Sequence, residues 1–345
     1  MRPQPMGVTS HDVARLAGVA QSSVSRALRG ASGVSSATRA RIQAAAAELG
    51  YTPSEVGRSL VTRSTRTIGI LVTDLSSVFY PHLIGPLHEE VTASGYRMVV
   101  FTDGVDSDGP TDESAIRRLL DRSIDGAVLT TSKLGGTLPR ELATHGLPFV
   151  FLTRYVEDVV ADYSITDNAL GAALMAAEVV RVGHREVAAI FGPENTSTGR
   201  DRDRGTRAAL GAAGIELAPE RVERGPFLYE TGYQSMGRLM ALRPRPTVVI
   251  CGNDTVAIAA LNAARGLGVR VPEDVSVVGF DDLPMAGWEA FQLTTVHQPM
   301  EDMAKTAVRL LVDRIEGRVQ APALRRVVFD PTLVIRKTLG PPKNS

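Results

Sequence analysis

Polar, charged and aromatic side chains follow five short apolar runs of the sequence. The runs and their followers are 68–72 with Asp74, Phe79 and Tyr80; 149–152 with Thr153 and Arg154; 187–191 with Arg200 and Arg202; 248–251 with Asn253 and Asp254; and 275–280 with Asp281 and Asp282. If the runs are parallel strands, these side chains gather at the sheet edge that binds ligands. Together they suit a small polyhydroxylated ligand, although each alone could equally be a helix cap or a turn residue.

Enzyme chemistry finds little support in the sequence. The chain has no G-x-G-x-x-G, Walker A, G-x-S-x-G or H-E-x-x-H motif, and its six histidines show no metal-ligand spacing. The single cysteine, Cys251, excludes an intrachain disulfide and a zinc site built from paired cysteines. We therefore expect a non-enzyme without cofactor or metal.

Apolar runs alternate with amphipathic stretches from Thr67 onward, and these elements must position the candidate side chains. Further runs cover 98–101 and 127–129, and the helical stretches include 83–94, 169–182, 206–213 and 255–267. Strands that alternate with helices predict buried parallel strands in βαβ units. Because the runs are too many for one small sheet, we expect an α/β core of two doubly wound halves.

Composition and charge divide the chain into unlike parts. Its 345 residues, 43% of them hydrophobic, fit a globular protein of two domains or slightly more. Residues 1–66 hold nine arginines and three acids, although the formal net charge is zero. A basic end on an acidic body indicates nucleic-acid binding at that end. No apolar stretch approaches about 18 residues, and no secretory h-region is present, so we expect a cytoplasmic protein with no membrane association.

The first 50 residues predict three short helices. Thr9 with Asp12 resembles a capping box, Gly18 ends the first helix, and Ser35 is a candidate N-cap of the third. Two helices joined around a glycine form a helix-turn-helix. Its expected core is Val13, Leu16, Val24, Leu28, Ile42 and Leu49.

A short linker follows this all-α head. The segment SEVGRSLV after Pro53 is shorter than the roughly 12–15 residues that an isolated helix needs. Gly57 costs about 1 kcal/mol of helix stability relative to alanine. Alone, the segment should be mostly coil.

Longer stretches resemble the lactose/galactose-repressor (LacI/GalR) family of bacterial transcription regulators. They are VTSHDVARLAGVAQSSVSRALRG, VSSATRARIQAAAAELGYTPSEVGRSL, RTIGILVTDLSSVFY, RVGHREVAAIFGP, CGND, VSVVGFDD, LTTVHQP and DPTLVIRKT. The resemblance implies a core similar to periplasmic sugar-binding proteins, and a homodimer that binds a pseudo-palindromic DNA operator. It implies a repressor whose operator affinity is controlled by a small ligand, a sugar or its phosphate. A secreted solute receptor would instead need an export signal and no basic head.

Domain boundaries follow from the resemblance and the pattern together. We expect a helix-turn-helix domain in residues 1–52, a hinge helix and linker in 53–66, and an effector-binding and dimerisation core in 67–339. Within the core, subdomain 1 covers about 67–166 and 300–327, and subdomain 2 covers about 167–297 and 328–339.

DNA-binding roles come from positions that match the family. Gln21 and Ser22 occupy the variable base-reading positions, and Arg26 matches a position that reads a further base. Glutamine can pair with adenine, arginine with guanine, and serine with several base edges. The matched phosphate contacts are Thr9, Ser25, Ser35 and Thr38, with Arg29 as a possible addition. Ser35 and Thr38 could instead serve only as caps.

A leucine in the hinge is expected to couple effector binding to DNA binding. Leu60 matches the family leucine that wedges into a central minor-groove step beside its dimer mate; the alternative is a buried linker leucine. A hinge that is helical only against DNA and its twin lets an effector weaken binding by changing the core dimer.

Effector-binding roles also come from matched positions. The residues are Phe79, Thr153, Arg202, Asn253, Asp281, Trp288 and Gln298, with Arg200 as the alternative to Arg202. Thr153 stands where members of the family often have an acidic residue, so the identity of the effector cannot be inferred from a relative. Ala20 and Gly57 also depart from the family pattern, and the tail GPPKNS lacks the leucine heptads of a tetramerising coil.

Overall fold

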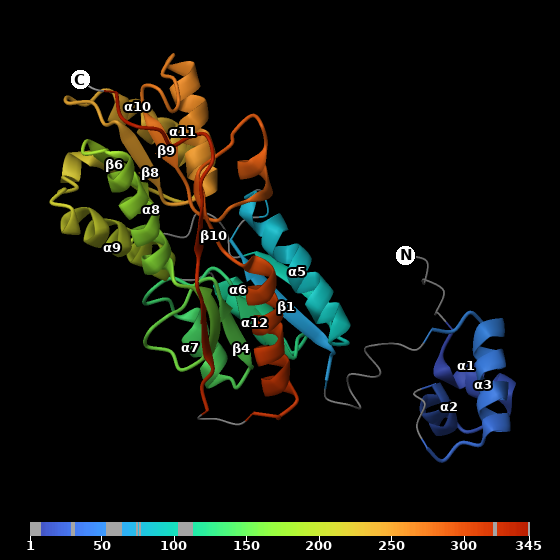
Figure 1. Cartoon of the computed structure of the whole chain (residues 1–345). Helices are drawn as coiled ribbons and strands as arrows, with labels where there is room; N and C mark the ends of the chain where they lie inside the picture. The colour runs from blue at the N-terminus through green and yellow to red at the C-terminus, as the bar shows by residue number, and fades with distance from the viewer. Residues whose placement is uncertain are drawn as a thin grey trace. The chain divides into compact units, whose positions relative to one another are not determined.

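The computed structural model describes residues 8–28, 32–52, 64–73, 75, 77–102, 113–319 and 323–343. The chain divides into two compact units, Met1–Thr65 and Arg66–Ser345, which are described separately below (Figure 1). None of the described helices is both long and apolar enough to span a membrane.

In the described part of the N-terminal unit there are three helices, α1 Ser10–Ala17, α2 Gln21–Leu28 and α3 Ser36–Glu48. The predicted capping box is present, because the Thr9 side chain accepts from the Asp12 amide and the Asp12 side chain accepts from the Thr9 amide. Gly18 ends α1 in the left-handed region with φ 62°, where glycine has no Cβ penalty.

The small core of this unit lies where the three helices meet. Val13, Val24 and Ile42 are at most 1% exposed and pack with alanines of all three helices. Leu16, expected in this core, is 47% exposed. The buried arc of α1 runs through Val13 and Ala17, and Leu16 lies beside that arc.

Two α/β lobes form the second unit. The sheet of lobe 1 has the strand order β11-β5-β4-β3-β1-β2 and is parallel throughout. Its strands are β1 Thr67–Val72, β2 Arg97–Thr102, β3 Gly126–Leu129, β4 Phe149–Leu152, β5 Asp162–Thr166 and β11 Arg326–Phe329. Lobe 1 thus combines chain from both ends of the unit.

Lobe 2 has a parallel sheet of order β7-β6-β8-β9 and an antiparallel pair, β10 with β12. Its strands are β6 Val187–Phe191, β7 Val222–Arg224, β8 Val248–Cys251, β9 Ser276–Val278, β10 Thr295–His297 and β12 Thr332–Val334. The predicted crossing after residue 327 falls inside β11, so the chain passes between the lobes after Phe329.

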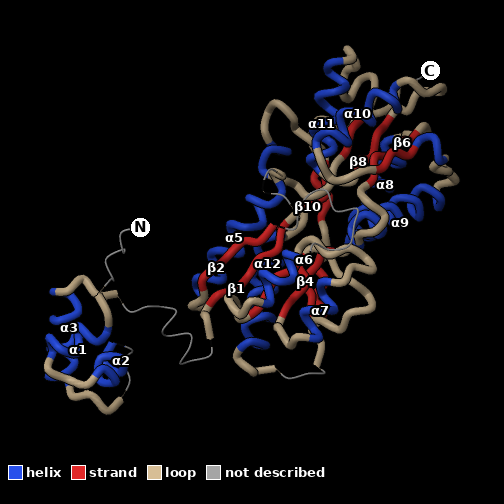
Figure 2. The backbone as a smooth tube through the Cα atoms, turned by 180° about the vertical axis from the view of Figure 1, so that it is seen from behind, coloured by secondary structure: helices blue, strands red, loops and turns tan. Residues whose placement is uncertain are grey.

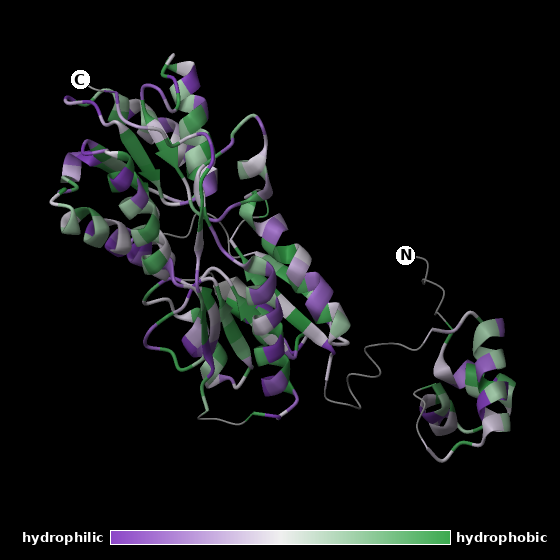
Figure 3. Cartoon of the chain, in the orientation of Figure 1, coloured by the Kyte–Doolittle hydropathy of each residue, from purple (hydrophilic) through white to green (hydrophobic). Residues whose placement is uncertain are grey.

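Helices cover both faces of each sheet (Figures 1 and 2). They are α5 Phe79–Ala93, α6 Glu113–Leu120, α7 Leu138–Thr144, α8 Asn168–Val182, α9 Ser197–Ala212, α10 Tyr229–Met240, α11 Asp254–Gly266 and α12 Met300–Ile315, with 3-10 turns at Pro219–Arg221 and Pro284–Gly287. The strands are mainly hydrophobic, whereas the helices carry hydrophilic residues along part of their length (Figure 3).

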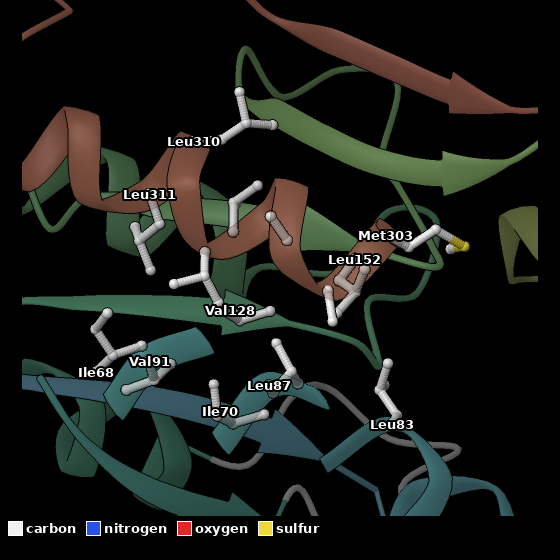
Figure 4. Close-up of a cluster of buried hydrophobic side chains, with 14 of the residues drawn as sticks. Ile68, Ile70, Leu83, Leu87, Val91, Val128, Leu152, Met303, Leu310 and Leu311 are labelled. Atoms are coloured by element: carbon white, nitrogen blue, oxygen red, sulfur yellow. The ribbon is translucent and has the colours of Figure 1, made fainter. Parts of the chain in front are cut away.

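Buried aliphatic side chains hold each sheet to its helices. In lobe 1, α5 and α12 pack on one face through residues such as Leu83, Leu87 and Leu311, which meet Ile70 and Val128 (Figure 4). The helices α6 and α7 pack on the other face. In lobe 2, α10 and α11 cover one face, and α8 and α9 cover the other. This three-layer packing brings the carboxyl ends of both parallel sheets toward the space between the lobes.

Candidate functional site

A cavity of about 170 Å³ lies between the two lobes. Its walls are loops and helix starts that follow strands of both sheets. Lobe 1 contributes Thr73, Ser77, Phe79, Tyr80, Thr130, Lys133, Thr153 and Arg154; lobe 2 contributes Pro193, Asn195, Thr196, Thr198, Arg202, Pro226, Phe227, Leu228, Asn253 and Asp281; and Gln298 comes from the crossing before α12. The cavity therefore lies where open α/β sheets bind ligands.

Arg202 is the most connected group of this wall. Its Nε donates to Asn168 Oδ1 at 2.8 Å and its Nη1 donates to the Gly252 carbonyl at 2.7 Å. Its Nη2 lies 3.2 Å from Asp281 Oδ1, and the guanidinium stacks 3.7 Å from the centre of the Phe280 ring. Burial lowers the pKa of Arg202, and the charge of Asp281 opposes that shift. The guanidinium is thus held rigidly as a cation.

Asp281 joins Arg202 to Gln298. Its Oδ1 accepts from Gln298 Nε2 at 2.7 Å, and burial raises the pKa of the carboxyl while Arg202 opposes that rise. The φ of Asp281 is 123°, a region that costs a non-glycine residue energy and is concentrated at functional sites. Thr153 on the opposite wall also has a positive φ, 67°. Both walls of the cavity thus contain a non-glycine residue with a positive φ.

Asn253 has two roles at the start of α11. Its Oδ1 accepts from the Val256 amide at 2.9 Å, which is the helix cap, and the residue also lines the cavity. The next residue, Asp254, lies behind the wall and accepts from Thr295 Oγ1 at 2.5 Å and from the Leu283 amide at 2.8 Å. Burial raises the pKa of Asp254. Asp254 therefore supports the site without lining it.

Aromatic rings provide the apolar part of the wall. Phe79 and Tyr80 at the start of α5 meet edge to face with ring centres 5.5 Å apart, and Phe227 stands on lobe 2. The Tyr80 hydroxyl and Thr73 Oγ1 are hydrogen-bonded at 2.8 Å. Rings beside convergent polar groups suit a ligand with hydroxyl edges and apolar faces.

Hydrogen bonds across the lobes lie next to the cavity. The Tyr155 hydroxyl of lobe 1 donates to Asp201 Oδ2 and accepts from Arg200 Nη2, both at 3.0 Å. The Tyr155 amide donates to Ser197 Oγ at 3.0 Å. We call these four residues the interlobe latch. Arg200, the alternative to Arg202 in the sequence, thus belongs to the latch.

The cavity gathers most of the effector residues expected from the sequence. Those that line it are Phe79, Thr153, Arg202, Asn253, Asp281 and Gln298. Trp288 does not line it and is 58% exposed. The 3-10 turn before Trp288 buries Leu283 and Ala286, and this leaves the indole on the outside.

Sequence reasoning missed several wall residues. Lys133 and Asn195 follow β3 and β6 within four residues, so the strand-end rule that found Asn253 could also have found them. Phe227 follows β7, a short polar strand that hydrophobic runs do not reveal.

On the N-terminal unit, α2 exposes Gln21, Ser22 and Arg26, whereas Val24 and Ala27 face the core. Gln21 Nε2 donates to Ser10 Oγ at 3.1 Å. Ser35 caps α3, since its Oγ accepts from the Thr38 amide at 3.2 Å. Thr9 caps α1, and Ser25 is half-buried. The matched residues Arg29 and Leu60 lie outside the described residues.

Comparison with known proteins fits both units. Residues 9–54 match the family described as bacterial regulatory proteins, lacI family, and residues 176–339 match the periplasmic binding protein-like domain. The ribose operon repressor of Haemophilus influenzae is 32% identical over 96% of this chain and 98% of its own length. The chain belongs to the LacI family.

Solved structures of LacI-family proteins agree with this assignment. The Lac repressor dimer bound to operator and the anti-inducer ONPF is 27% identical, with a TM-score of 0.84 over 96% of this chain and 99% of that one. The CelR–cellobiose complex is 32% identical, with a TM-score of 0.72 over 96% and 99%. This LacI-family chain is a ligand-controlled, DNA-binding transcriptional repressor and not an enzyme.

Proposed function

We propose that the cavity between the lobes is the effector site and that its ligand is a sugar or a sugar phosphate. The observation that carries this proposal is the buried set Arg202, Asp281 and Gln298 at a cavity that also exposes the rings of Phe79 and Phe227. Fixed polar groups can bind ring hydroxyls, and the aromatic rings can cover the apolar face of a sugar. Relatives named for ribose and a structure with cellobiose support the same ligand class.

For DNA, we propose that two copies of the chain bind a pseudo-palindromic operator. The α2 helix would enter the major groove, where exposed Gln21, Ser22 and Arg26 read base edges. Thr9, Ser25, Arg29, Ser35 and Thr38 would hold phosphates and fix the register. The support is that α2 presents these three side chains outward while its other face builds the core.

The linker would couple the two events. We propose residues 1–52 as the reading domain, 53–66 as the hinge with Leu60 in the minor groove, and 67–339 as the core. An effector can change operator affinity only if it binds the two core states unequally. Bonds between the lobes near the cavity, such as the interlobe latch, supply groups that such states could make or break.

A selection from random duplexes tests the DNA part. We expect the full chain to enrich a two-fold-symmetric site, with an affinity that falls steeply as salt rises. Arg26→Ala should weaken that site by about 1–3 kcal/mol and relax one base position in each half. Gln43→Ala, exposed on α3, is the matched control and should bind as the unchanged chain does.

Two results would contradict the proposal. One is an enriched site without two-fold symmetry. The other is operator affinity that no sugar or sugar phosphate changes, measured by fluorescence anisotropy with the full chain.

A further inference from the structure

The cavity wall holds two arginines with unequal surroundings. Arg202 is paired with Asp281 and makes two further hydrogen bonds, so its charge is matched inside the protein. Arg154, directly after the strained Thr153, lines the lobe 1 wall. The two cations face the same cavity, and Asp281 is the one carboxylate among the described residues that line it.

Few described groups offset the positive charge of Arg154. Within the described ranges, its one hydrogen bond runs from Nη1 to the Thr131 carbonyl at 3.4 Å, and no carboxylate lies within 4 Å of it. Burial lowers the pKa of Arg154, and among the described groups Tyr80 and Asp281 oppose that shift electrostatically. Arg154 is half-buried in the cavity wall, and a guanidinium fork fits carboxylate and phosphate oxygens in geometry and charge.

Gln298 supplies a second, independent signal. It is 1% exposed, its Nε2 donates to Asp281, and its Oε1 has no hydrogen-bond partner among the described residues. A buried amide oxygen of this kind needs a donor. Because Gln298 lines the cavity, a ligand hydroxyl can supply that donor.

We propose that the effector is an anionic polyol, which places a carboxylate or phosphate on Arg154 and donates a hydroxyl to Gln298 Oε1. This inference rests on the proposed function, because it specifies the ligand of the same cavity. The ribose and cellobiose named for relatives are neutral sugars, so an anionic effector would distinguish this chain from those relatives.

Titration calorimetry on the full chain can test the charge requirement with matched pairs. The probes are ribose with ribose 5-phosphate, glucose with glucose 6-phosphate, and glucose with glucuronate and gluconate. We expect at least one charged probe to bind at least tenfold more tightly than its neutral partner. A phosphate ester that wins identifies phosphate as the source of the anion, and a sugar acid that wins identifies carboxylate.

Variants assign the effect to residues. Arg154→Gln should remove at least tenfold of the affinity for the charged probe while leaving the neutral partner nearly unchanged. Arg185→Gln, exposed on lobe 2 outside the cavity, is the matched control and should keep the preference. Gln298→Met should weaken the charged and neutral probes alike, since both donate the same hydroxyl. Thermal unfolding without ligand checks that each variant is folded.

Three results would overturn the inference: neutral probes that bind as tightly as their charged partners, no binding by any charged probe, or an Arg154→Gln variant that keeps the preference. If a neutral sugar nevertheless changes operator affinity, the proposed function stands and only this inference fails. If operator affinity responds to no probe, the proposed function fails too.

Discussion

Three buried side chains of the cavity wall depend on one another. Asp281 forms an ion pair with Arg202 and accepts a hydrogen bond from Gln298. A buried pair of this kind is a weak source of stability when intact, but removal of one partner leaves a desolvated charge. Asp281 therefore has a structural role as the ion-pair partner of Arg202, in addition to its proposed role in ligand binding.

Asp281→Asn keeps the shape of the side chain and removes its charge. We expect a loss of about 3–5 kcal/mol in the free energy of unfolding, since Arg202 stays buried without its carboxylate. Urea denaturation of the full chain measures it. Glu289→Gln breaks the exposed pair with Lys337 and should change stability by less than about 0.5 kcal/mol. Equal effects of the two substitutions would show that burial of the pair is unimportant.

Asp254 gives stability a pH dependence. Burial and the nearby Asp281 carboxylate raise its pKa, so the folded chain keeps a proton that the unfolded chain has lost. The resulting stabilisation is complete below about pH 4 and is lost as pH rises through the raised pKa. We expect Asp254→Asn to lose less stability than the unchanged chain between pH 5 and pH 8, in urea melts across that range.

Asp274→Asn is the control for this measurement. Arg270 and Lys343 lower the pKa of Asp274, so its titration lies below the range tested. An unchanged pH slope in Asp254→Asn would contradict the assignment of the buried proton to Asp254.

At the scale of elements, the interlobe latch consists of hydrogen bonds that can form only when the two lobes are close together. The Tyr155 hydroxyl is bonded to Asp201 and Arg200, and burial raises its pKa to about 12, so it remains a donor. A ligand that binds between the lobes should have a higher affinity when hydrogen bonds hold the lobes together.

Tyr155→Phe keeps the ring and removes the hydroxyl. Hydrogen bonds to charged groups contribute about 1.5–3 kcal/mol, so we expect effector affinity to fall by about tenfold or more. Calorimetry with the preferred probe measures this. Tyr233→Phe, exposed on α10, should leave the affinity unchanged. Unaltered affinity in Tyr155→Phe would mean that the latch does not contribute to ligand binding.

The hinge segment allows a prediction from helix propensity alone. If residues 53–66 form the proposed hinge helix, Gly57→Ala lowers the cost of helix formation by about 1 kcal/mol for each copy of the chain, so operator affinity should rise about fivefold per copy. Gly211→Ala is the control, because Gly211 lies in α9 with open space at its Cβ position. It should leave operator affinity as it was. If Gly57→Ala also has no effect, the hinge does not fold upon binding DNA.

Strands that are buried along their whole length were predictable. The bounds of β4, β6 and β8 coincide with the apolar runs, because every residue in them is buried. The edge strands β7 and β11 were not predicted. Both are partly exposed and short, β7 is mainly polar, and each pairs with a strand that is distant in the sequence. For the site, residue types at strand ends pointed to the cavity. The strained φ of Asp281 and the Gln298 oxygen, which has no hydrogen-bond partner in the described part of the chain, required the three-dimensional structure.

At the scale of the molecule, the two units have separate hydrophobic cores. Ile42 is fully buried in the small N-terminal core, whereas the lobes are held by four clusters of their own. Damage to the N-terminal core should therefore leave the cavity intact.

Ile42→Ala should cost about 2–5 kcal/mol in that core, enough to unfold so small a unit. We expect operator binding to be lost while effector binding persists, as anisotropy and calorimetry on the same preparation would show. Leu16→Ala, at a position 47% exposed in the same unit, should preserve operator binding. Loss of effector binding in Ile42→Ala would mean that the cores are not independent.

The chain passes between the lobes after Thr166, after His297 and after Phe329, and α12 and β11 are the last pieces of lobe 1 to be made. On the ribosome, the three-helix unit can fold soon after it emerges. Lobe 1 must wait until its sixth strand leaves the exit tunnel, near the end of synthesis. A prematurely terminated product would thus contain a folded N-terminal unit and an incomplete α/β unit. The cell's proteases would have to remove such a product.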